Sequence, residues 1–148
     1  MPFSDHRELI TVMTELWILL DELAILEPGA LQLPPTDSGV HPASSFHAKL
    51  ALAAGYSPEA AAVMSSLPYL HDGDQRAVEI DGTTFPLSFL HADEYDFTYR
   101  REMFADGNLM PPSAFRLTWQ DVNGWEYIYD TEKRQSSLLY QRWRRRHY

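Results

Sequence analysis

The sequence contains no cysteine among its 148 residues. This absence excludes disulfide scaffolds, thiolate zinc sites, iron–sulfur clusters and cysteine nucleophiles. Glycine is also scarce, and the seven glycines are scattered among turns. The patterns GxGxxG, GxxxxGK, GxSxG and HExxH are all missing, so the sequence gives no reason to expect nucleotide-dependent redox chemistry, P-loop hydrolysis, a serine-hydrolase elbow or a zincin site.

The chain also lacks a long uncharged hydrophobic run. Residues 9–26 are densely apolar, but Glu15, Asp21 and Glu22 interrupt them. A bilayer-spanning helix needs about 20 residues with almost no charge. The first residues are acidic and no small-residue cleavage site follows, which argues against a secretory signal. We therefore expect an intracellular, cytoplasmic protein without a membrane partner.

Basic residues are rare outside the C-terminal end. Residues 1–131 contain 20 Asp and Glu against 6 Lys and Arg, whereas residues 132–148 contain one acidic and six basic residues. The net charge of the whole chain is −9. An acidic body repels the phosphate backbone, which supplies the main attraction in nucleic-acid binding. We therefore expect that the partner is not a nucleic acid, and a basic protein partner suits the negative net charge of this chain.

The composition is that of one folded domain, 45% hydrophobic and 22% charged, and we expect a single domain over residues 1–148. Its first half, residues 1–70, reads as mainly helical. Helices are predicted over residues 8–26, after a cap at Asp5, over 44–54, and over 57–66.

The first predicted helix has a wide apolar stripe. One face carries leucines and a methionine at helical spacing, and Trp17 and Ile18 broaden it. Either the helix lies in the centre of the core, which we favour, or it also contributes to a homodimer. The residues expected to share the core face are Leu9, Met13, Leu16, Leu20 and Leu23.

The second half, residues 71–148, reads as rich in hairpins. Asp81-Gly82 predicts one hairpin over residues 77–90, and Asn123-Gly124 predicts another over residues 115–129. Residues 136–146 are expected to close the chain as a basic C-terminal helix. Helices followed by hairpins, without alternating βα units, predict an α+β fold in which N-terminal helices pack on a small antiparallel sheet.

Polar residues at the two ends of the first predicted hairpin form an enzyme-like constellation. His71 and Asp74 precede it, and His91 and Asp93 follow it. Imidazole nitrogens and carboxylate oxygens suit a divalent metal or an acid/base pair. Hairpin ends also gather polar residues for solvation and turn formation, and the spacing matches no specific metal motif. A metal-dependent or acid/base enzyme that uses these four residues is therefore an alternative to the interpretation we favour.

Acidic and aromatic side chains alternate in the segment after that hairpin, with Arg100 and Arg101 beside them. Acidic groups steer a basic partner, and aromatic rings supply contact area at interfaces. We expect a non-catalytic protein-interaction module without a cofactor, and the partner-binding residues are predicted to be Asp93, Glu94, Tyr95, Asp96, Phe97 and Tyr99.

The second predicted hairpin carries an aromatic stripe. Alternation places Trp125, Tyr127 and Tyr129 on one face, and Glu126 and Ile128 on the other. Such a stripe is most often core. A small-ligand binder that uses these rings as pocket walls is a third hypothesis.

Two short segments, Leu67-Pro68-Tyr69-Leu70 and the run from Asn123 to Thr131 (NGWEYIYDT), resemble fungal members of the SUKH superfamily. That superfamily includes fungal cell-wall regulators and bacterial toxin-immunity proteins. The resemblance covers mainly residues 67–70 and 115–131, under a fifth of the chain. It implies an α+β domain in which residues 123–131 form a hairpin strand, and a non-catalytic binding module with a variable partner. It transfers no catalytic residues.

Overall fold

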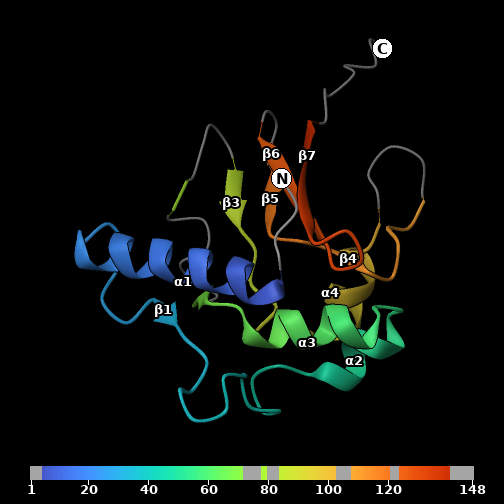
Figure 1. The fold of residues 1–148 in the computed structure, drawn as a ribbon, viewed down its shortest axis with the longest axis horizontal. Helices are drawn as coiled ribbons and strands as arrows, with labels where there is room; N and C mark the ends of the chain where they lie inside the picture. The colour runs from blue at the N-terminus through green and yellow to red at the C-terminus, as the bar shows by residue number, and fades with distance from the viewer. Residues whose placement is uncertain (1–4, 72–77, 80–83, 103–107, 121–123, 141–148) are drawn as a thin grey trace.

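The chain adopts the α+β fold class that the sequence predicts, as seen in a computed structural model (Figure 1). The structure describes residues 5–71, 78–79, 84–102, 108–120 and 124–140. Its helices are α1 (His6–Glu22), α2 (Ala48–Ala53), α3 (Pro58–Ser66) and α4 (Glu94–Tyr99). Its strands are β1 (Leu31–Gln32), β2 (Tyr69–Leu70), β3 (Thr84–Pro86), β4 (Ala114–Arg116), β5 (Thr118–Gln120), β6 (Trp125–Asp130) and β7 (Gln135–Tyr140). Among the described residues, no helix is both long and apolar enough to cross a bilayer.

Two helix starts follow the capping rules. The Asp5 carboxylate accepts a hydrogen bond from the Glu8 backbone N–H at 3.1 Å and opens α1. The Ser57 hydroxyl accepts one from the Ala60 N–H, and Pro58 takes the first helical position of α3. Each cap satisfies a donor that has no partner inside its helix. Both starts are as predicted, whereas α2 begins only after His47, later than the expected residue 44.

The buried face of α1 differs from the predicted one. Leu9 is buried, and Met13 and Leu20 are half-buried and pack against the core. Leu16 and Leu23, which were expected on the same face, are exposed, and the side chain that enters the interior is Trp17. Because apolar residues occupy more than half of the helix circumference, the pattern alone does not fix which part of the stripe faces inward.

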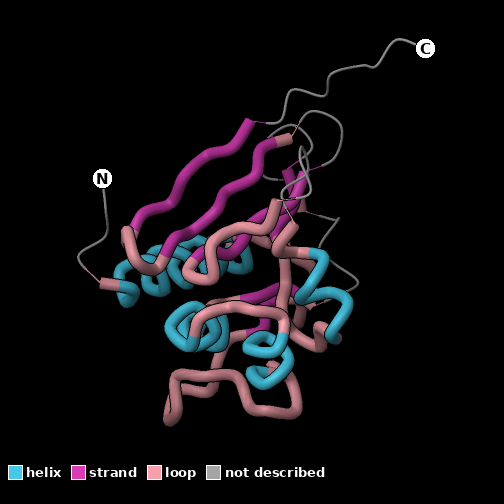
Figure 2. The backbone as a smooth tube through the Cα atoms, turned by 90° about the vertical axis from the view of Figure 1, so that its right-hand side faces the viewer, coloured by secondary structure: helices cyan, strands magenta, loops and turns pink. Residues whose placement is uncertain are grey.

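The strands form three small antiparallel sheets, β1–β2, β3–β5 and β4–β6–β7. Two hydrogen bonds join the β3–β5 sheet to the β4–β6–β7 sheet: the Leu117 N–H donates to the Tyr127 carbonyl, and the Thr118 hydroxyl donates to the Trp125 carbonyl. Pro86 lies in β3, where a missing backbone donor is tolerated at an edge. The long strands β6 and β7 lie along one side of the molecule, and the helices lie against their other side (Figure 2).

The hairpin predicted around Asn123-Gly124 is confirmed in part, because β4 pairs with β6 whereas Thr118 and Trp119 of the same predicted arm pair with β3. Phe115 pairs with Tyr129 and Arg116 with Ile128. The predicted C-terminal helix is wrong over residues 136–140, which form β7 and pair with β6 in a six-residue register. The remainder of that expectation, residues 141–146, lies outside the described residues. In the hairpin predicted over residues 77–90, β3 pairs with β5, and much of its first arm and its turn at 80–83 lie outside the described residues.

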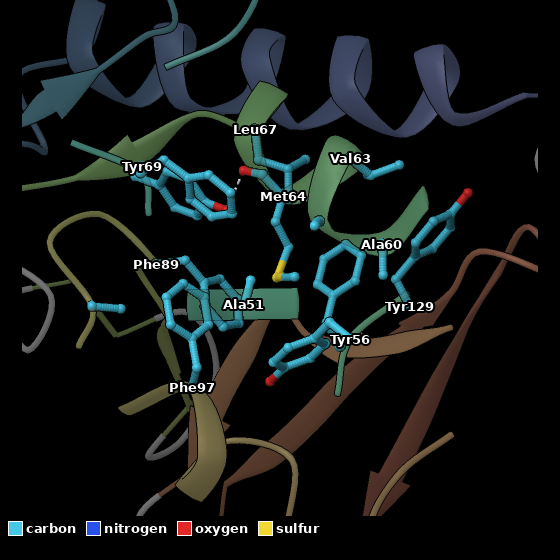
Figure 3. Packing of buried hydrophobic residues seen from close by; sticks show 14 of the residues in the cluster. Ala51, Tyr56, Ala60, Val63, Met64, Leu67, Tyr69, Phe89, Phe97 and Tyr129 are labelled. Carbon is cyan, nitrogen blue, oxygen red and sulfur yellow. Dashed lines mark hydrogen bonds between the residues drawn. The ribbon is translucent and has the colours of Figure 1, made fainter. Parts of the chain in front are cut away.

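The main core is built from aromatic rings contributed by both halves of the chain (Figure 3). The Phe89 ring is its hub: it stacks on Phe97 with ring centroids 5.8 Å apart and meets Phe115 edge-on at 6.2 Å. Edge-on and stacked ring pairs add stability beyond their buried area. A second cluster joins the C-terminal part of α1 to the first sheet, and its buried members are Trp17, Leu26, Ala30, Leu70 and Val78.

Candidate interaction surface

Helix α4 carries the predicted interaction segment, and two aspartates hold its first turn. The Asp93 carboxylate accepts a hydrogen bond from the Asp96 N–H at 2.8 Å, and the Asp96 carboxylate accepts one from the Asp93 N–H at 3.1 Å. This reciprocal arrangement is a capping box, with aspartate in both side-chain positions. His91 precedes it with a φ of 57°, and its N–H donates to the Ser45 carbonyl, which anchors the entry to the helix.

The aromatic residues of α4 divide between interior and surface. Tyr95 is 72% exposed and Tyr99 is 38% exposed. One helical turn separates them, and their rings stack with centroids 5.9 Å apart and planes within 9° of parallel. Phe97 is fully buried and packs on Phe46, Tyr56 and Phe89. The expectation that Phe97 faces a partner is therefore wrong, because the helix places its side chain toward the core.

The two arginines that follow α4 point inward. Arg100 donates to the Ser88 carbonyl, and its guanidinium lies over the Phe89 ring. Arg101 is 7% exposed, donates to the Ala54 and Met110 carbonyls, and lies over a buried tyrosine ring. Both bind backbone oxygens, so they fasten α4 to neighbouring segments. Their positive charge does not add to the outer face of the helix.

A glycine makes the Arg101 anchor possible. Gly55 ends the α2 segment with a φ of 100°, a conformation that side-chain-bearing residues rarely adopt. A Cβ atom at this position would collide with the Arg101 guanidinium. Gly55 is therefore required both for the turn and for the close approach of the arginine.

The outer face of α4 forms an acidic and aromatic hollow. It is shallow, open to solvent, about 450 Å³ in volume, and lined by Asp93, Glu94, Tyr95 and Thr98. Glu94 is exposed, and no described residue forms a hydrogen bond or ion pair with its carboxylate. We call these four residues together with Tyr99 the tyrosine–carboxylate surface. Its chemistry is that of a receptor for a cationic group, because carboxylates pair with cations and a tyrosine face attracts them.

The residues of the enzyme hypothesis are not seen assembled. His71 and His91 are both exposed, and Asp93 serves as the helix cap. Asp74 lies outside the described residues. Among the residues that the structure describes, no three His, Asp or Glu side chains are grouped as they would be around a metal ion.

A buried ion pair in the second hairpin was not expected. Glu126 was assigned to the face opposite the aromatic stripe, and it is 1% exposed. Its carboxylate lies 3.7 Å from the Arg116 Nε, which is equally removed from solvent. Burial raises the pKa of Glu126, and the neighbouring Arg116 partly offsets this. The strand register would have predicted this ion pair. Arg116 pairs with Ile128, so Glu126 is the diagonal neighbour of Arg116 on the same face of the sheet.

The aromatic stripe itself is only partly core. Tyr129 is fully buried, whereas Trp125 and Tyr127 are half-buried. Both faces of β6 are covered, because Glu126 and Ile128 on the opposite face are buried too. The small-ligand hypothesis for these rings stays a prediction.

Two histidines act as structural links. The His6 ring nitrogens contact the Tyr129 hydroxyl at 2.8 Å and the Glu59 carboxylate at 2.6 Å, which joins α1 to both β6 and α3. His41 is buried, and its Nε2 donates to the Leu67 carbonyl at 2.8 Å. Burial lowers the pKa of His41, although this hydrogen bond opposes the shift.

Comparison with known proteins gives no further guide: no family model, no curated protein and no solved structure matches the chain. The chemistry of the tyrosine–carboxylate surface is therefore the basis for the proposed function.

Proposed function

We propose that this chain is a non-catalytic protein-interaction module that binds a basic segment of a partner protein through the tyrosine–carboxylate surface. The observation that carries the proposal is the exposed, stacked pair of Tyr95 and Tyr99 beside the carboxylates of Asp93 and Glu94. A large ring held at the surface by a second ring is already ordered, so little side-chain entropy is lost when a partner covers it.

The ligand that fits this chemistry is an arginine or lysine side chain. A guanidinium seated on the Tyr95 face gains about 0.5–1 kcal/mol at an exposed site, and more when water is excluded. The Glu94 carboxylate can accept charge-assisted hydrogen bonds from the same group. The net charge of −9 attracts such a partner over a longer range and raises its association rate.

The proposal includes membership of the SUKH superfamily. The segment whose sequence resembles those domains, residues 123–131, contains strand β6, and residues 67–70 lead into β2. A binding module with a variable partner is what that resemblance implies. The acidic and aromatic surface on α4 is the feature of this chain that suits such a role.

Selection from a displayed random-peptide library tests the proposal. We expect the wild-type protein to enrich peptides rich in arginine and lysine, and their binding to weaken as salt screens the carboxylates. The variant Glu94→Gln with Tyr95→Ala should lose these peptides and remain folded. The control variant Glu132→Gln with Leu52→Ala alters exposed residues elsewhere and should keep them. The proposal fails if no basic consensus emerges, or if the α4 variant binds the selected peptides as well as the control does.

A further inference from the structure

Helix α1 leaves an apolar stripe uncovered on its outer side. It consists of three helical residues and the C-cap Leu23, at spacings of four, three and four, and they are between 47% and 61% exposed: Val12, Leu16, Leu19 and Leu23. At 100° per residue they fall within about 60° of arc, and they extend over about 16 Å of helix. Apolar residues exposed singly are ordinary, but four in one line form a contiguous patch. We call these residues the α1 stripe.

The stripe has the spacing of a helix–helix seam. Alternating steps of three and four residues are the a and d positions of a heptad, the pattern by which one helix packs lengthwise against another. On one side the stripe borders Met13 and Leu20, which pack into this protein's own core. On the opposite side it borders exposed residues, so an incoming helix would lie along the α1 stripe with one flank facing away from this core.

That outer flank is acidic. Glu8, Glu15 and Glu22 follow one another at intervals of seven residues and are all exposed. They occupy the g positions of the same heptad, next to the stripe, and charges at these positions select the partner of a helix pair. The only lysine or arginine in α1 is Arg7, in its first turn. A partner helix is therefore favoured when lysine or arginine flanks its apolar face.

A second copy of this chain fits poorly. In an antiparallel pair of α1 helices the two glutamate rows would face each other, and like charges there destabilise the contact. In a parallel pair the glutamates would face the positions of Met13 and Leu20, which this protein's own body covers. We propose that the α1 stripe is a docking site for a basic amphipathic helix of another protein. This site is on a different helix from the tyrosine–carboxylate surface and does not depend on that proposal.

Two designed peptides test the inference with the full chain. Both have three heptads with leucine at a and d. The first has lysine at e and g (the Lys-peptide), and the second has glutamate there (the Glu-peptide). Fluorescence anisotropy of the labelled peptides gives their affinities, and circular dichroism reports helix formation on binding. We expect the wild-type protein to bind the Lys-peptide at least about tenfold more tightly than the Glu-peptide.

Three variants separate docking on the stripe from general attraction to an acidic protein. Leu16→Ser with Leu19→Ser should weaken Lys-peptide binding at least about tenfold, whereas the control Ile18→Ser with Ile25→Ser, which removes exposed apolar residues off the stripe, should change it less than about twofold. Glu15→Lys with Glu22→Lys should reverse the preference and bind the Glu-peptide more tightly. Near-UV circular dichroism checks that each variant is folded.

Three results would overturn the inference. The first is equal Lys-peptide affinity in the wild type and the leucine variant. The second is an unchanged preference in the charge-reversed variant. The third is a wild-type dimer in light scattering that the leucine variant converts to a monomer. The Glu94→Gln, Tyr95→Ala variant should still bind the Lys-peptide, so failure of the proposed function and failure of this inference are distinguishable.

Discussion

Substitution of the aromatic residues of α4 tests the division of this short helix into an inner and an outer face. Phe97→Ala removes a ring that is fully buried and touches three other rings with centroids 5.8–6.1 Å away. Loss of a buried phenylalanine costs about 3–5 kcal/mol, as the sum of lost transfer free energy and the cavity left behind. Tyr95→Ala removes a ring that is 72% exposed, and only its stack on Tyr99 is lost, so it should cost less than about 1 kcal/mol.

Urea denaturation measures both effects, because Trp17 is buried and its fluorescence reports unfolding. With a slope of about 2 kcal/mol per molar urea, Phe97→Ala should lower the midpoint by about 1.5–2.5 M, and Tyr95→Ala by less than about 0.5 M. The total stability of such a domain is about 5–15 kcal/mol, so the Phe97 variant is expected to fold but to be fragile. Equal midpoints for the two variants, or a larger loss for Tyr95→Ala, would refute the assignment of the two faces.

Four further substitutions probe the buried polar residues Glu126, Arg116 and His41 and the half-buried His6. Glu126→Leu removes the carboxylate beside the buried Arg116 guanidinium and should lower the free energy of unfolding by about 3–5 kcal/mol. The additional change Arg116→Met should recover at least half of that loss, and urea unfolding measures both effects. The pKa of His41 is lowered in the folded state, so the neutral ring contributes stability above the ordinary pKa of 6.5, and this stability is lost as the pH falls below 6.5. His41→Gln should therefore flatten the decline in the free energy of unfolding between pH 7 and pH 5. An unchanged slope would contradict this. His6→Ala removes the link to the Tyr129 hydroxyl and should cost about 1–3 kcal/mol in the same assay, while a loss near zero would mean that α1 is held by its apolar contacts alone.

The sequence predicted the local features of the fold well. The caps at Asp5 and Ser57 are encoded within a few residues, and both are confirmed. The pairing of β4 with β6 confirms part of the hairpin predicted over residues 115–129. The predicted C-terminal helix is wrong over residues 136–140 because their apolar pair, Leu138 and Leu139, is compatible with either period. Pairing with β6, a long-range interaction, decided for the strand.

The candidate surface was predicted in part. The segment was chosen for its acidic and aromatic composition, but the helix that sorts its side chains was not predicted. The Asp93-x-x-Asp96 capping box was the available signal, and it would have put Phe97 on the face opposite Tyr95 and Tyr99. The burial of Glu126 required the hairpin register as well as the alternation of residues along one strand.

The His6 link joins the first helix of the chain to a strand 123 residues later. During synthesis at about 5–20 residues per second, His6 is made roughly 6–25 s before Tyr129. Until then the start of α1 lacks its contact with β6 and is held only by partners made earlier, such as Glu59 of α3. Nascent chains that end before β6 should therefore be cleaved in α1 by added protease much faster than the finished protein. The order in which the elements are made therefore leaves the longest helix of the described fold without one of its contacts until late in synthesis.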